Sequence, residues 1–169
     1  DNNGTKVLNQ RCIRKHSISY EFSRQHNHNE KKISLDKYLQ NADVLVNSTG
    51  VGTLGRVAQF FGENNKITVD THITIVRPNK KIFEDYFFGL SMIMIEDIIS
   101  KSGEGSTGQT ELPRERLSKI KIRFPKSFDE QKKISEKILL EREFIYNNKS
   151  LIETFTKKIE DKLNRIWSN

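Results

Sequence analysis

The last quarter of the chain, residues 127–169, constrains the fold most, because it is predicted to form one helix that is too long for a globular domain. The segment contains neither Pro nor Gly, and it opens with Ser127-Phe128-Asp129-Glu130. A Ser and a Glu three residues apart can each accept a hydrogen bond from a free backbone N–H at the helix start. At about 1.5 Å per residue, a helix of about 40 residues is roughly 60 Å long. We therefore expect it to pack against another long element.

Apolar side chains recur along this helix with the seven-residue period of a coiled coil. The predicted interface consists of Ile138, Ile145, Ile152, Phe155, Ile159 and Ile166. Glu141, Asn148 and Lys162 interrupt this seam, which weakens pairing but can fix its register. No upstream segment is predicted to form a helix of matching length. The partner helix is therefore expected to come from a second copy of this chain or from another part of a longer polypeptide. The alternative is a helix that folds back over its own domain.

The length of 169 residues suits one globular domain, expected at residues 1–126, followed by the helix at 127–169. No apolar run approaches the roughly 18 residues that a membrane span needs, so no membrane association is expected. The chain opens with Asp1 and not with Met, which suggests the edge of a fragment. Cys12 is the single cysteine, which excludes an internal disulfide and a thiolate-rich zinc site and favours a reducing, cytoplasmic location. The four histidines form no HExxH motif, so we predict no metal.

The formal net charge of +7 points to a polyanionic partner, and nucleic acid is the first candidate. Many basic proteins merely carry solvated lysines, so the charge alone does not decide the function. The long helix is itself close to charge balance. The excess positive charge therefore belongs mainly to the domain and to residues 114–133.

The domain is predicted to be α+β, with a twisted β-sheet and a packed helix. One or two strands are expected within residues 6–20, a polar loop at 21–32, and a short helix or turn at 33–39. Further strands are expected at residues 43–47, 66–69, 72–76 and 120–124. A helix over residues 82–100 has apolar positions broad enough to be buried against the sheet, namely Phe83, Tyr86, Phe87, Leu90, Ile93, Met94, Ile98 and Ile99. Pro113 suits the first turn of a further short helix.

Residues 50–55 match the GxGxxG pattern of dinucleotide-binding proteins, and Asp70 follows at a suitable distance. The interval between Gly55 and the Gly62 turn is nevertheless too short for the crossover helix of a βαβ unit. The same run resembles a protein-kinase glycine loop, but the HRD, DFG and VAIK motifs are missing from the sequence. The glycines then form either plain β-turns or a backbone surface that can approach phosphate, as can the second Gly/Ser/Thr loop at residues 103–110. No catalytic set or cofactor motif is recognisable, so neither catalysis nor a cofactor is expected.

Two runs of sequence resemble the target recognition domain of a type I restriction-modification specificity subunit. The first is residues 43–57, DVLVNSTGVGTLGRV. The second joins residues 105–112, GSTGQTEL, to residues 117–122, LSKIKI, and to residues 130–134, EQKKI. The resemblance covers most of residues 5–169. The family usually has a double proline before the Glu-Gln pair of the helix, whereas this chain has Pro125-Lys126-Ser127-Phe128.

The resemblance implies an organisation in which two recognition domains are held apart by two long antiparallel helices. Each domain then reads one half of a split target in double-stranded DNA. This chain has one domain and one helix, so it resembles half of such a subunit, paired either with itself or with a second half in a longer chain. The implied partners are DNA methyltransferase (modification) subunits and a restriction subunit, and the specificity subunit itself is not catalytic.

The residues predicted to contact DNA lie in three polar or basic segments. They are Arg14, Arg24, Gln25, Asn27, Asn47, Ser48, Thr49, Arg56, Lys101, Ser106, Thr107 and Gln109. Small hydroxyl groups and lysines suit phosphate, whereas Arg, Asn and Gln can also address base edges in the major groove. Two alternatives stay open: a protein-interaction module that uses only the Ile seam, and the recognition domain of a single-chain restriction-methylation enzyme.

Overall fold

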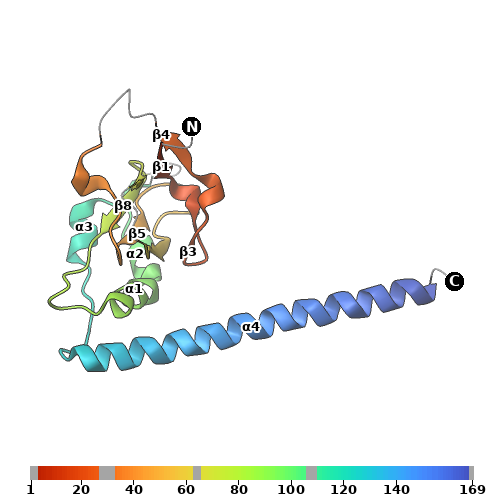
Figure 1. Ribbon diagram of the computed structural model, residues 1–169. Helices are drawn as coiled ribbons and strands as arrows, with labels where there is room; N and C mark the ends of the chain where they lie inside the picture. Colours follow the sequence, from red (N-terminus) through yellow and green to blue (C-terminus); the bar gives the residue numbers. More distant parts are fainter. Residues whose placement is uncertain (1–3, 27–32, 63–65, 106–109, 168–169) are drawn as a thin grey trace. The chain divides into compact units, whose positions relative to one another are not determined.

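The computed structural model describes residues 4–26, 33–62, 66–105 and 110–167, and the chain divides into two compact units (Figure 1). The first unit, residues 1–131, is an α+β domain, and the second, residues 132–169, is helical. Helix α4 (Phe128–Trp167) begins within the first unit, so its first turn belongs to the domain. None of the described helices is long and apolar enough to cross a membrane.

A three-stranded antiparallel sheet separates two hydrophobic cores in the first unit. Its order is β6-β5-β8, with β5 at Val44–Asn47, β6 at Val57–Gln59 and β8 at Ile73–Val76. Side chains alternate between the two faces of a strand. Leu45 therefore packs in the first core, whereas Val44 and Val46 pack in the second. This two-sided burial explains why β5 is a continuous apolar run.

Short strands and 3-10 turns cover the first face of this sheet. They are β1 (Thr5–Leu8), η1 (Gln10–Cys12), β2 (Ile13–Arg14), β3 (Ser17–Ile18), η2 (Tyr20–Phe22), β4 (Arg24–His26), η3 (Leu35–Lys37) and β7 (Ile67–Val69). Strand β1 pairs antiparallel with β4 and parallel with β7. The prediction of a loop throughout residues 21–32 was wrong at β4, where the ladder with β1 binds the backbone while Arg24 and Gln25 stay exposed.

Helices α1 (Asp85–Met94), α2 (Glu96–Lys101) and α3 (Arg114–Lys119) build the second core. The single helix predicted over residues 82–100 is thus two helices, because the backbone leaves helical geometry at Ile95 (φ −100°, ψ 14°). This break ends the common apolar stripe. Three side chains predicted to be buried are instead exposed, namely Tyr86 at 42%, Met94 at 78% and Ile98 at 54%.

The strand predicted at residues 120–124 does not form. Ile120 and Ile122 pack against the second core while Lys121 and Arg123 are exposed, so the alternation of the sequence is real. No described strand pairs with this segment. Alternation here reflects packing on one side of an extended chain, which sequence periodicity alone cannot distinguish from a ladder.

Gln131 fixes the first turn of α4 within the domain. Its side chain is fully buried; Oε1 accepts a hydrogen bond from the Glu84 N–H at 2.8 Å, and Nε2 donates to the carbonyls of Ile82 and Pro125 at 3.0 and 2.7 Å. The predicted helix start is confirmed, because Ser127 Oγ accepts a hydrogen bond from the Glu130 N–H at 3.4 Å.

The second unit presents its predicted seam to solvent. Ile138 is partly exposed, and the other five seam residues have exposed fractions of 54–68%. These five are Ile145, Ile152, Phe155, Ile159 and Ile166. Coiled-coil pairing through them stays a prediction.

Candidate nucleic-acid interface

Basic side chains gather around two aromatic rings where β1, η1, β2, η2 and β4 meet. The guanidinium groups of Arg11 and Arg14 lie 4.8 and 4.6 Å from the centroid of the Phe22 ring. The ammonium of Lys6 lies 5.6 Å from the Tyr20 ring. Such cation–π contacts hold the cations in place while leaving their hydrogen-bond donors available. We call this surface the basic face, and it consists of Lys6, Arg11, Arg14, Tyr20, Phe22 and Gln25.

The antiparallel pairing of β1 with β4 extends the basic face. Lys6 stands opposite Gln25, so these two side chains share one face of the ladder, whereas Arg24 stands opposite Val7 and its side chain lies on the other face. The red and orange strands of Figure 1 show this corner of the first unit. Partial burial raises the pKa of the Tyr20 hydroxyl, so the group keeps its proton at neutral pH and can donate a hydrogen bond.

Two of the predicted contact residues, Arg14 and Gln25, belong to the basic face, and Arg24 lies on the other face of the β1–β4 ladder; all three are exposed. The sequence prediction did not single out Lys6, Arg11, Tyr20 or Phe22 as contact residues. Interleaved basic and aromatic residues between positions 6 and 25 were the available signal. Asn27, Ser106, Thr107 and Gln109 lie outside the described residues.

The residues that follow the second Gly/Ser/Thr loop lie beside the first loop. Thr49 forms an antiparallel bridge with Glu111, and the Leu112 N–H donates to the Ser48 carbonyl at 2.7 Å. Thr49 Oγ1 also lies 2.6 Å from His72 Nδ1. The structure therefore brings Glu111 and Leu112 to the first loop at the end of β5.

Two predicted contact residues in this region are buried, which contradicts a direct role at DNA. Asn47 is fully buried, and its Nδ2 donates to the Gln10 carbonyl at 3.0 Å, which ties β5 to η1. Ser48 is 6% exposed, and both its backbone N–H and its carbonyl are hydrogen-bonded to neighbouring segments. Both residues thus hold neighbouring segments in place through hydrogen bonds, whereas Thr49 is partly exposed.

Glycine at positions 52 and 55 serves different purposes. Both have positive φ, at 71° and 84°. A Cβ at Gly52 would meet no atom within 4 Å, so the loop backbone is open there, whereas a Cβ at Gly55 would lie 2.5 Å from the Cα of Ser100. The turn prediction for these glycines is confirmed, and β5 and β6 form an antiparallel pair instead of a βαβ unit.

Arg56 and Lys101 flank this turn. The Arg56 guanidinium donates to the Gly52 carbonyl at 2.9 Å and is partly exposed. Lys101 is the exposed last residue of α2 and follows Ser100, against which Gly55 packs. The turn therefore carries two cations next to an accessible backbone, an arrangement that suits a phosphate group.

A match with a protein family indicates what these surfaces serve. A family model described as the type I restriction modification DNA specificity domain matches residues 3–160. The chain belongs to this family. A search of curated proteins gave no match. Type I restriction modification DNA specificity is therefore the role of this domain, and domains of the family are in general non-catalytic recognition domains.

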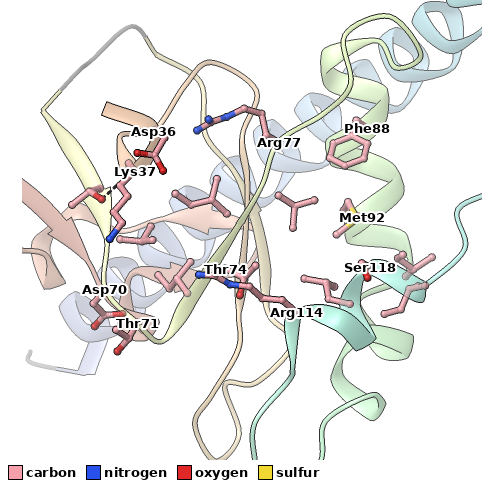
Figure 2. A pocket seen from close by; sticks show the side chains of 18 of the residues that line it. Asp36, Lys37, Asp70, Thr71, Thr74, Arg77, Phe88, Met92, Arg114 and Ser118 are labelled. Atoms are coloured by element: carbon pink, nitrogen blue, oxygen red, sulfur yellow. Dashed lines mark hydrogen bonds between the residues drawn. The ribbon is translucent and has the colours of Figure 1, made fainter. Parts of the chain in front are cut away.

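A groove of about 830 Å³ runs along β8 of the specificity domain, and its described lining contains none of the residues predicted to contact DNA (Figure 2). Phe88 and Met92 of α1 form part of an apolar wall, and charged side chains, Lys37 and Arg114 among them, lie at other points of its lining. A hydrogen bond to Asp43 raises the pKa of Arg77, so its guanidinium stays charged. Apolar walls suit an apolar group better than a DNA backbone, so we do not assign the groove to the interface.

Proposed function

We propose that this chain is the DNA-reading part of a type I restriction-modification specificity subunit, or a half-length version of it. The observation that carries the proposal is the basic face. Its cations lie over aromatic rings or on paired strands, so they are ordered before DNA arrives. Ordered cations lose less conformational freedom on binding than free lysines do.

The basic face combines groups for positioning and for reading. Lys6 and Arg11 suit phosphate oxygens, which fix the register of a protein on duplex DNA. Arg14 can donate two hydrogen bonds to guanine, and Gln25 can address adenine, in the major groove. The exposed Arg24, on the other face of the β1–β4 ladder, could also donate to guanine. The loops at the end of β5 add a second phosphate contact through Thr49, Arg56 and Lys101, together with Ser106, Thr107 and Gln109.

Helix α4 provides the assembly function in this proposal. Its exposed Ile seam pairs with a second long helix, from another copy of this chain or from the second half of a longer one. The paired helices set the distance between two half-sites of a bipartite target. Modification subunits and a restriction subunit dock on this assembly, and the catalytic steps belong to them.

Salt dependence of DNA binding tests the proposal. Each phosphate contact that is lost should lower the slope of log K against log salt by about 0.9. We expect the double variant Lys6→Gln/Arg11→Gln, assembled with modification subunits, to show a smaller slope than the parent in fluorescence anisotropy titrations. Lys121→Gln is the matched control, because Lys121 is exposed beside the second core, across the central sheet.

The titrations test the contact surface and the sequence-reading function separately. An unchanged slope in the double variant would reject the basic face as the contact surface. Parent binding that is equal for all duplex sequences would reject the reading function itself and favour the interaction module.

A further inference from the structure

The hairpin of β2 and β3 has an unusual tip. Arg14 pairs with Ser17, so Lys15 and His16 alone form the connection. Both have positive φ, at 48° and 60°. A two-residue hairpin loop of this kind strongly favours Asn-Gly or Asp-Gly, because a side chain with a Cβ disfavours positive φ.

The stem of this hairpin is firmly held. Cys12 and Ile13 are fully buried, and Ile18 packs against the first core. The ladder is prolonged by the Ser19 N–H, which donates to the Cys12 carbonyl at 2.8 Å. A rigid stem thus presents an exposed tip, since residues 14–17 are all exposed.

Two contacts fix the side chains on either side of Lys15. Arg14 Nε donates to the Arg11 carbonyl at 3.0 Å, while its guanidinium covers Phe22. His16 Nε2 lies 3.4 Å from Glu96 Oε2, an oxygen that also accepts the Val57 N–H at 2.8 Å. Lys15 is left between them as an exposed ammonium at the end of an ordered hairpin.

Selection for stability alone would not place Lys-His at this turn. Unfavourable backbone geometry that the surrounding structure enforces occurs preferentially at functional sites. A two-stranded ribbon fits the major groove of B-DNA, where a lysine can donate to guanine O6 and N7. The tip also adjoins Arg14 of the basic face.

We infer that the β2–β3 hairpin enters the major groove and that Lys15 at its tip determines specificity for a guanine within the half-site. Arg14 lies beside it, and Glu96 acts as a positioning residue through His16. This inference rests on the proposed DNA-reading function and names the part of the surface that reads.

The test uses the double variant Lys15→Asn/His16→Gly, whose Asn-Gly turn suits the same hairpin. A half-site is first obtained by selection from random duplex DNA with the parent chain and its modification subunits. The affinities of the parent and the variant are then measured for every single base-pair substitution in that half-site. Lys121→Asn, with its exposed lysine beside the second core, controls for the lost charge.

The parent should lose roughly 5- to 150-fold in affinity on substitution at each position that it reads, which corresponds to about 1–3 kcal/mol per base contact. The double variant should fold with an unchanged or higher melting temperature and lose discrimination at one to three adjacent positions that include a guanine. The single variant Lys15→Ala should lose discrimination at the guanine position. Lys121→Asn should keep the parent profile.

The failures of the two proposals differ. A variant with the same substitution profile as the parent would overturn the hairpin inference and leave the reading function intact. A parent without any position-dependent loss would overturn both. Loss of affinity by the same factor at all positions would show that Lys15 contacts phosphate, which also overturns the inference.

Discussion

Replacement of Gln131 by Leu tests whether the buried amide anchors the first turn of α4. The change removes three hydrogen bonds, to the Glu84 N–H and to the carbonyls of Ile82 and Pro125, with little change in volume. Each backbone group left without a partner costs about 1–3 kcal/mol. These groups are only part-buried, so the low end applies, and the loss is about 3 kcal/mol.

The apolar side chain of Leu recovers part of this loss. Burial of the added apolar surface stabilises by about 1 kcal/mol, which leaves a net destabilisation of about 2 kcal/mol. With a urea m-value of about 2 kcal/mol/M, the unfolding midpoint should fall by about 1 M. Near-UV circular dichroism should follow the transition, because the aromatic side chains are concentrated in the first unit.

Lys133→Leu is the control for this experiment. Lys133 is exposed on the same helix, so its replacement should change stability by less than about 0.5 kcal/mol. A loss below about 0.5 kcal/mol for Gln131→Leu, or equal losses in both variants, would refute the anchoring role.

Three further predictions concern a glycine turn, the helix seam and the cysteine. Gly55→Ala should destabilise the domain by at least 1 kcal/mol more than Gly52→Ala in thermal unfolding. Both substitutions add about 1–2 kcal/mol of backbone strain, but only Gly55 packs against the α2 backbone. Equal losses of stability in the two variants would contradict this packing. Ile152→Glu should convert a self-paired dimer into a monomer in sedimentation analysis, whereas Ser150→Glu should not, and a monomeric parent would contradict self-pairing. Burial raises the pKa of the Cys12 thiol, so it should resist a disulfide reagent in the folded state. Because the folded state then holds its proton more tightly than the unfolded state, stability should fall as the pH rises above about 8.5 and on through the higher folded pKa; rapid modification at pH 7 would refute this burial.

The sequence predicted correctly those elements whose local pattern is compatible with only one structure. The β5 run, buried on both faces, and the uninterrupted α4 segment are examples. The short interval after Gly55 correctly excluded a βαβ crossover. In each case, length or composition alone removed the competing structures.

Long-range contacts explain what the sequence did not predict. Strand β4 carries polar side chains and exists because β1 pairs with its backbone. The position of Asn47 at the end of a strand suggests an exposed amide, yet its side chain is buried and donates to the Gln10 carbonyl, 37 residues away. The basic face likewise combines short elements that sheet pairing brings together, so the sequence supplied its residues without their arrangement.

Selection of duplex DNA from a random pool would show whether the domain reads a DNA sequence. The chain, assembled with modification subunits, would be allowed to bind at physiological salt, and the recovered DNA would be sequenced. We expect enrichment of one short motif, repeated as two separated halves if two copies pair through α4. Recovery of DNA without any enriched motif would contradict the claim that this specificity domain reads sequence through its basic face.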